Sequence, residues 1–141
     1  ESQPAFGPFK LEGKEVADLD LVHQDLRLVT GRRSPVYFHS EHRQIPWLRS
    51  IDPDPLVEIH PAAAAKEGIG DGEWVWVENW QGRAKLKAKV SPIVPRWMVM
   101  AAHGWWFPER KGAEPDLYGT WESNINMLLP MGAQGKDGLG A

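Results

Sequence analysis

Residues 84–90 alternate strictly between small or aliphatic side chains and lysines, in the order Ala-Lys-Leu-Lys-Ala-Lys-Val. Successive side chains of a β-strand point to opposite faces, so this pattern predicts a strand with one face in a core and the other in water. Lysines on an exposed face also discourage association between sheet edges. The alternative interpretation of the lysines is a track that binds phosphate. The segment directs the fold prediction towards β structure.

Other short strands are predicted between frequent glycine and proline breaks. They cover residues 26–30, 56–59, 73–78 and 97–102. One clear helix is predicted from Pro61, because proline suits the first helical turn, four alanines follow and Gly68 is placed to end it. About six short strands, one or two short helices and many turns predict a small β-barrel.

The chain of 141 residues has the length of a single domain, which can bury roughly two thirds of its unfolded surface. We expect an N-terminal arm or linker at 1–20, a β-barrel domain at 21–129 and a flexible, glycine-rich tail at 130–141. Hydrophobic content of 42% and charged content of 25% are ordinary for a globular protein. Without a transmembrane run or a signal-peptide pattern, we expect a soluble piece whose compartment the sequence does not indicate.

Composition excludes several kinds of site. The absence of cysteine removes disulfides, thiolate nucleophiles, zinc–thiolate sites and iron–sulfur ligation. His39 and His42 have the spacing of metal ligands on a helix, but neighbouring carboxylate or cysteine partners are missing, so no metal site is predicted. No catalytic triad or carboxylate pair is predicted either. The net charge of -3 argues against general affinity for nucleic acid.

Strand 26–30 runs into Gly31 and then into a basic segment that reaches residue 50 and contains Glu41 as its single acid. We expect the strand to end at Gly31, where glycine permits a positive φ and close approach of a ligand to main-chain N–H groups. Guanidinium groups can add paired hydrogen bonds to a phosphate or a heterocycle. The cations and donors of the segment are Arg32, Arg33, His39, His42, Arg43 and Arg49. The segment predicts a loop for a polyanionic ligand rich in hydrogen-bonding groups.

Strand 97–102 repeats this design, because it runs into His103 and Gly104 and then into three consecutive aromatic residues, 105–107. Three such neighbours cannot all face one core, so at least one is expected to project towards a ligand or partner. Packing in the core and between domains is the alternative. A barrel with approximate internal two-fold symmetry would produce this pair of strands.

These segments resemble the C-terminal dinucleotide-binding domain of molybdopterin oxidoreductases of the dimethyl sulfoxide reductase type. The resemblance covers roughly residues 20 to 130, with its motifs in the same order. The motifs are Thr30-Gly31-Arg32, His39-Ser40-x-x-Arg43, Leu48-Arg49, residues 57–75, residues 103–108 and Glu122-Ser-Asn124-Ile-Asn126-Met-Leu128.

The resemblance implies a closed, six-stranded double-psi β-barrel that covers bis(molybdopterin guanine dinucleotide), with molybdenum or tungsten held by the cofactor and other domains. It also implies cofactor-binding roles: the Thr30 motif wraps the pterin or its pyrophosphate, His39 and Ser40 lie near the pterin, and Asn124 or Asn126 reads a pterin or guanine edge. The full set of implied cofactor-binding residues is Thr30, Gly31, Arg32, His39, Ser40, Arg43, Gly104, Trp105, Asn124 and Asn126.

The chain is not expected to be catalytic alone. The resemblance implies that it completes the cofactor site of an oxidoreductase, as a domain fragment or small subunit, with the remaining domains or a large subunit as partner and without direct membrane insertion. Two alternatives stay open: a double-psi recognition domain that needs no cofactor, and a barrel that binds aromatic or sugar ligands through exposed tryptophans. The sequence indicates neither the substrate nor the metal.

Overall fold

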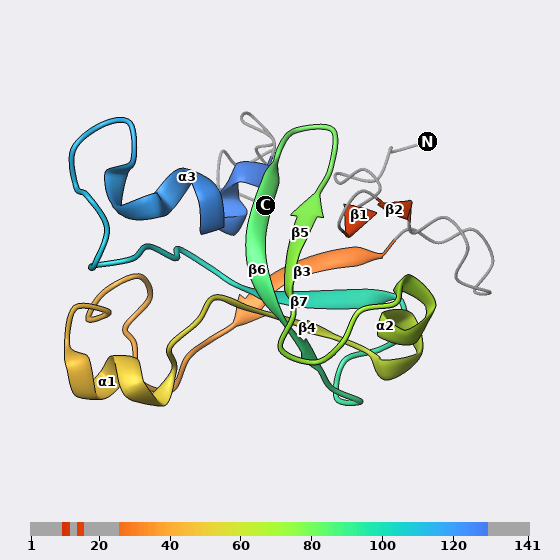
Figure 1. Ribbon diagram of the computed structural model, residues 1–141. Helices are drawn as coiled ribbons and strands as arrows, with labels where there is room; N and C mark the ends of the chain where they lie inside the picture. The colour runs from red at the N-terminus through yellow and green to blue at the C-terminus, as the bar shows by residue number, and fades with distance from the viewer. Residues whose placement is uncertain (1–9, 12–13, 16–25, 130–141) are drawn as a thin grey trace, which may run out of the picture.

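A computed structural model describes residues 10–11, 14–15 and 26–129, which form a mainly β fold (Figure 1). The strands are β1 (Lys10–Leu11), β2 (Lys14–Glu15), β3 (Arg27–Arg32), β4 (Leu56–Ile59), β5 (Trp74–Glu78), β6 (Arg83–Val90) and β7 (Met98–Ala102). The α-helices are α1 (Pro46–Ile51), α2 (Pro61–Glu67) and α3 (Thr120–Ser123), and 3₁₀ turns occupy η1 (Leu117–Gly119) and η2 (Ile125–Leu128). The prediction of a mainly β protein with few short helices is confirmed.

The strands that the structure describes belong to one sheet, in the order β2-β1-β5-β6-β4-β7-β3. The sheet is mixed: β5 pairs antiparallel with β6 and β4 with β7, whereas β4 pairs parallel with β6 and β3 with β7. In the described part of the chain, β3 and β2 are the two edges and do not pair with each other. The predicted closure into a six-stranded barrel is therefore not seen and stays a prediction.

The alternating pattern of residues 84–90 gives strand β6 one buried apolar face and one face that carries the lysines, as the sequence predicts. Ala84, Leu86 and Ala88 are buried in the main apolar core, and the lysines between them lie on the other face. All three lysines of the strand face carboxylates: the Nζ atom of Lys87 lies 2.8 Å from Asp54, that of Lys89 lies 3.3 Å from Glu58 and that of Lys85 lies 3.9 Å from Glu122. The pattern thus positions β6 at the centre of the fold.

Helix α2 begins and ends where the sequence predicts. The His60 side chain accepts a hydrogen bond from the Ala62 N–H at 3.0 Å, and Pro61 fills the first turn. Gly68 ends the helix in the left-handed conformation, with φ of 66°. This helix lies at the opposite end of the sheet from α1 and α3 (Figure 1).

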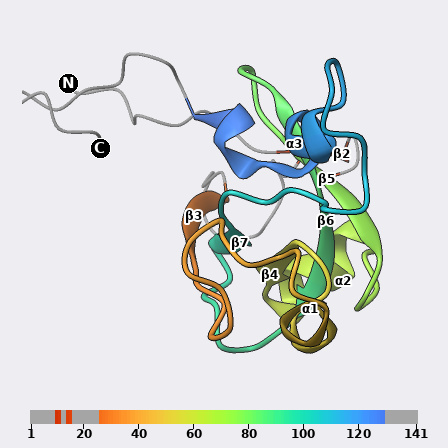
Figure 2. The same ribbon diagram turned by 90° about the vertical axis from the view of Figure 1, so that its left-hand side faces the viewer.

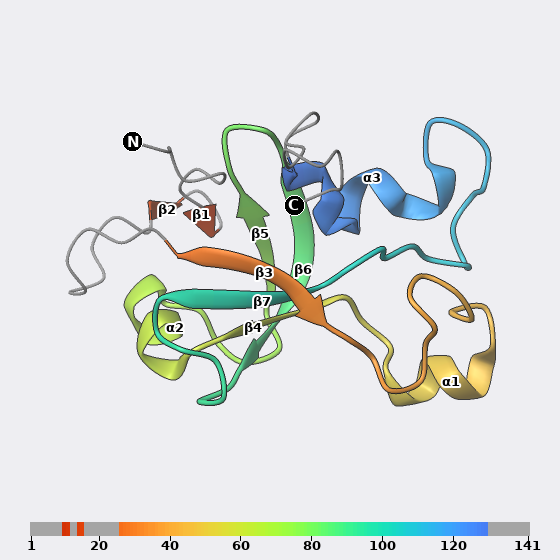
Figure 3. The same ribbon diagram turned by 180° about the vertical axis from the view of Figure 1, so that it is seen from behind.

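The prediction that the first strand stops at Gly31 is wrong. Strand β3 continues to Arg32 through an irregular register between Val29 and Arg32, and Gly31 does not have a positive φ. Strands β3 and β7 run side by side in parallel, and both end towards α1 and α3 (Figure 3). The two segments in which a strand runs into a glycine, at Gly31 and at Gly104, are therefore neighbours in space.

The predicted arm is partly described. Strand β1 pairs with β5, and β2 pairs with β1, so residues 10–11 and 14–15 extend the sheet beyond β5. The rest of the arm and the predicted tail at 130–141 lie outside the described residues. Among the helices that the structure describes, none combines the length and the apolar character needed to cross a membrane.

Candidate functional site

A pocket of about 420 Å³ opens where β3 and β7 end. Its walls come from the end of β3, the loop before α1, the end of β7 and η2. The lining residues are Thr30, Gly31, Arg33, His39, Ser40, His103, Gly104 and Asn126. Figure 2 looks onto this end of the molecule, where the loop after β3 (orange) lies beside the segment after β7 (teal).

The two loops of the pocket are held close together by backbone features. His39 has a φ of 52° and Gly104 a φ of 57°, and both values lie in the left-handed region that side chains rarely adopt. A Cβ atom on Gly104 would stand 3.1 Å from the Ser40 Cβ, so glycine permits this approach. The Trp106 Nε1–H donates a hydrogen bond to the Ser40 carbonyl at 2.5 Å. These contacts give the pocket a defined wall.

As far as the structure describes the chain, the lining is rich in hydrogen-bond donors and contains no acidic residue. Arg33 is exposed and brings a positive charge, and the rings of His39 and His103 meet edge to face with their centroids 5.7 Å apart. Burial lowers the pKa of His103, and the positive charges of His39, Arg33 and Arg43 lower it further. His103 is therefore neutral at neutral pH, with a buried Nδ1 atom that has no hydrogen-bond partner among the described residues. Such a pocket suits a ligand that combines negative charge with a polar heterocycle.

The structure brings together many of the residues that the sequence predicts for cofactor binding. Those that line this pocket are Thr30, Gly31, His39, Ser40, Gly104 and Asn126. They come from segments nearly 100 residues apart in the sequence, so the tertiary fold is what assembles them. Side chains of the described residues do not fill the pocket.

Arg32 does not line the pocket. Its Nε donates a hydrogen bond to Glu58 at 3.2 Å, and its Nη1 lies 3.5 Å from an Asp52 carboxylate oxygen. It faces a second hollow, of about 290 Å³, which also contains Asp54 and Lys87. Arg32 is thus engaged in ion pairs away from the candidate site.

Arg43 and Trp105 lie beneath the pocket and do not line it, since only 2% and 1% of their surfaces are exposed. Asn124 caps η2, because its side-chain oxygen accepts a hydrogen bond from the Asn126 N–H at 3.0 Å. These positions differ from the cofactor contacts that the sequence predicts for the three residues.

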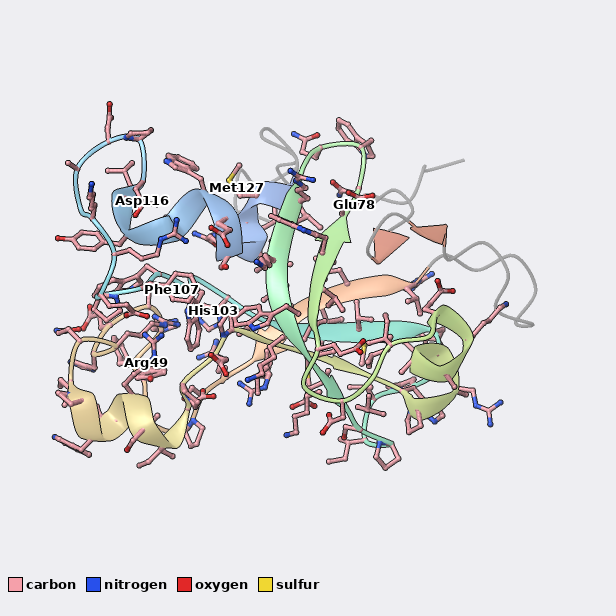
Figure 4. The ribbon with its side chains drawn as sticks, viewed as in Figure 1. Arg49, Glu78, His103, Phe107, Asp116 and Met127 are labelled. Atoms are coloured by element: carbon pink, nitrogen blue, oxygen red, sulfur yellow. The ribbon has the colours of Figure 1, made fainter. Side chains whose placement is uncertain are left out.

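None of the three consecutive aromatic residues lines the pocket. Trp105 is in the core, and Phe107 packs against it with ring centroids 6.3 Å apart. Trp106 packs edge to face on Tyr118, 5.5 Å away. Figure 4 shows Phe107 close to His103, with Arg49 below both. Packing in the core, one part of the alternative interpretation, describes Trp105 and Phe107 better than projection towards a ligand does.

Arg33, a cation of the predicted polyanion-binding loop, and His103 line the pocket but are absent from the implied set of cofactor-binding residues. Arg33 lies two positions after Gly31, and residues two apart in an extended segment share a face. His103 comes directly before Gly104, as Thr30 comes directly before Gly31. The similarity of the two strand ends could therefore have indicated His103 as a pocket residue.

A family model described as "Molydopterin dinucleotide binding domain" matches residues 26–136. The chain belongs to this family. Members of the molybdopterin dinucleotide binding domain family are parts of larger molybdopterin oxidoreductases, in which they bind the dinucleotide cofactor. The resemblance seen in the sequence motifs is confirmed.

Relatives of this domain include a dopamine dehydroxylase of Eggerthella lenta, 40% identical over 94% of this chain and 12% of the relative. The acetylene hydratase of Syntrophotalea acetylenica is 36% identical over 82% of this chain and 16% of the relative. A solved structure of acetylene hydratase from Pelobacter acetylenicus superposes with a TM-score of 0.70 and 36% identity, over 73% of this chain and 14% of that one. The chain therefore spans about one seventh of the length of these relatives.

Proposed function

We propose that this chain binds molybdopterin guanine dinucleotide through the pocket between β3 and β7 and so completes the cofactor site of a molybdenum- or tungsten-dependent oxidoreductase. The remaining domains of a larger protein supply the metal ligand and the substrate site. When bound, the cofactor supplies the redox chemistry, and this chain supplies binding and orientation.

The observation that carries the proposal is the convergence of Thr30, His39, Gly104 and Asn126, from four separate segments, on one pocket that also contains Arg33. The family motifs name most of these residues independently of the fold.

The residues present fit such a cofactor. Arg33, the hydroxyls of Thr30 and Ser40 and exposed main-chain groups suit phosphate oxygens, and the Asn126 carboxamide offers both a donor and an acceptor to a heterocycle edge. The buried, unpartnered Nδ1 atom of His103 is a further polar group for a ligand to satisfy. Because the pocket is open and the chain is a small part of its relatives, other domains would contribute the remaining contacts.

None of the tryptophans lines this pocket, so the sugar-binding alternative has no support at the site. A recognition domain without a cofactor is disfavoured by family membership.

We further propose that the fold is a double-psi β-barrel. Two features support this topology: parallel pairs β3–β7 and β4–β6, and the antiparallel β4–β7 pair that joins them. The pairs are related as an internal two-fold repeat would relate them.

The test uses two neighbouring arginines in the full-length protein that carries this chain. Arg33→Ala removes the charged donor of the pocket, so we expect cofactor retention to weaken about tenfold, which is the typical cost of one charge-assisted hydrogen bond. Arg32→Ala removes ion pairs with Glu58 and Asp52, so it should lower the melting temperature and leave the cofactor content of the folded protein unchanged. Metal analysis and release of guanine nucleotide report the content. Unchanged content in Arg33→Ala would count against the proposal.

A further inference from the structure

We infer that Arg43 is a positioning residue that ties together the two loops of the pocket, and that it does not contact the cofactor itself. The inference rests on the function proposed for the pocket. It assigns the arginine of the His39-Ser40-x-x-Arg43 motif a structural task within the site.

One nitrogen atom of Arg43 reaches both loops. The Nη2 group donates a hydrogen bond to the His39 carbonyl at 3.4 Å and another to the His103 carbonyl at 3.3 Å. His39 and His103 both line the pocket, and they come from segments 64 positions apart in the sequence. Arg43 therefore links the loop before α1 to the end of β7 directly behind the pocket wall.

Aromatic rings fix the guanidinium in this place. Its central carbon lies 4.5 Å from the centroid of Trp105 and 5.0 Å from that of Tyr37, and these two rings meet edge to face. The Tyr37 hydroxyl donates a hydrogen bond to the Asp52 carbonyl at 2.7 Å, which anchors that ring. The Nε and Nη1 atoms of Arg43 have no hydrogen-bond partner in the described residues. The two loop carbonyls and the ring faces are thus the main interactions of the group.

The charge of the group strengthens both hydrogen bonds. Burial lowers the pKa of Arg43 to about 10, so the guanidinium still carries its charge at neutral pH. A charged donor holds a carbonyl more strongly than a neutral one does. The two hydrogen bonds thus connect His39, which has the left-handed conformation, to His103, the residue before Gly104. Lysine lacks the planar guanidinium group that stacks against Tyr37 and Trp105, so its ammonium group is not held at the position from which Nη2 reaches both carbonyls.

Arg49 provides a matched control in the same aromatic cluster. Its guanidinium lies 5.4 Å from the centroid of Trp105 and 5.7 Å from that of Phe107. Its hydrogen bonds go to the Pro53 carbonyl at 2.7 Å and to Glu109 at 3.1 Å, and neither acceptor lines the pocket. A lysine at position 49 would disturb the cluster but not the link between the loops.

The experiment compares Arg43→Lys with Arg49→Lys in the full-length protein. Both variants should lower the melting temperature. Only Arg43→Lys should weaken cofactor retention, by about tenfold, because only this change frees the pocket loops. Equal loss of cofactor in the two variants at equal loss of stability would overturn the inference, since Arg43 would then serve stability alone.

Hydrogen exchange in the cofactor-free wild-type protein gives a second test that needs no variant to fold. Amides of residues 39–41 and 103–106 should exchange slowly and at similar rates, because one side chain holds both segments. Exchange of residues 39–41 at the rate of an unstructured peptide would overturn the inference. These amide rates do not depend on the cofactor, whereas Arg33→Ala reports on the proposed function, so the two proposals fail separately.

Discussion

Gly104 lies against Ser40 so closely that a Cβ atom added to the glycine would stand 3.1 Å from the Cβ of the serine. This contact joins the end of β7 to the loop before α1 at the rim of the pocket. The φ of 57° at Gly104 means that both the backbone conformation and the space favour glycine. The shape of the pocket therefore depends on glycine, which has no side chain, at position 104.

Gly104→Ala should lose stability and cofactor together. The left-handed backbone costs about 1–2 kcal/mol for a residue with a Cβ, and crowding would displace Ser40 and His39. Gly72→Ala is the control, because Gly72 has a φ of 81° and open space around its Cβ position. Thermal unfolding should show a loss in both variants, but cofactor content should fall only in Gly104→Ala. Equal cofactor content in both would mean that the Ser40 contact does not shape the site.

Trp105→Ala should destabilise the domain strongly, because Trp105 is 1% exposed and packs against Tyr37, Phe107 and Arg43. Replacing a buried large aromatic residue by alanine costs about 3–5 kcal/mol. Trp80 is 72% exposed, so Trp80→Ala should change stability by about 0.5 kcal/mol or less. Denaturant unfolding measures both values. A small effect of Trp105→Ala, together with loss of cofactor, would support the cofactor contact that the sequence predicts for this residue.

Local signals allowed much of the fold to be predicted. Helix α2 follows from Pro61, the alanines and Gly68, and strand β6 follows from its alternation, because in each the evidence lies within a few residues of the structure. Thr30, His39 and Gly104, which line the pocket, were named by the family motifs. The end of β3 was misjudged because the pairing with β7 carries the strand past Gly31.

Side-chain direction was harder to predict because it depends on distant partners. Arg32 turns away from the pocket towards Glu58, 26 positions later, and Arg43 is buried by Trp105, 62 positions later. A motif names both arginines but does not contain these partners. Whether an aromatic residue such as Trp105 faces a core or a ligand is likewise decided by the surrounding chain.

His103 should titrate below its ordinary value of 6.5, because burial and the nearby charges of His39, Arg33 and Arg43 disfavour its protonated form. The unfolded chain then binds more protons than the folded one below pH 6.5, so this residue's contribution to stability is complete above that pH and is lost as the pH falls towards the folded pKa. Arg33→Gln should raise the pKa of His103. NMR titration of the histidines checks both statements.

Lys66→Gln serves as the control for this titration, since Lys66 is an exposed residue near the end of α2. It should leave the pKa of His103 unchanged. A wild-type His103 pKa at or above 6.5 would contradict the electrostatic description of the pocket.

Asn126 lines the pocket, whereas Asn124 caps η2, so variants of these two residues test the two roles separately. Asn126→Asp places a negative charge in the pocket, so it should weaken retention of a phosphorylated cofactor, by about tenfold for one unfavourable charge contact. Asn124→Asp should keep both cofactor and stability, because aspartate caps a helical turn as well as asparagine does. Cofactor content and melting temperature of the full-length variants give the answer, and the opposite pattern would assign the cofactor contact to Asn124.

The location of the cofactor in the full-length protein tests the central claim most directly. We predict that an experimental structure of the loaded protein has phosphate or pterin atoms within about 3.5 Å of Arg33 and of the loop that contains His39 and Ser40. A structure in which side chains of another domain fill this pocket, and the cofactor contacts none of its residues, would contradict the account.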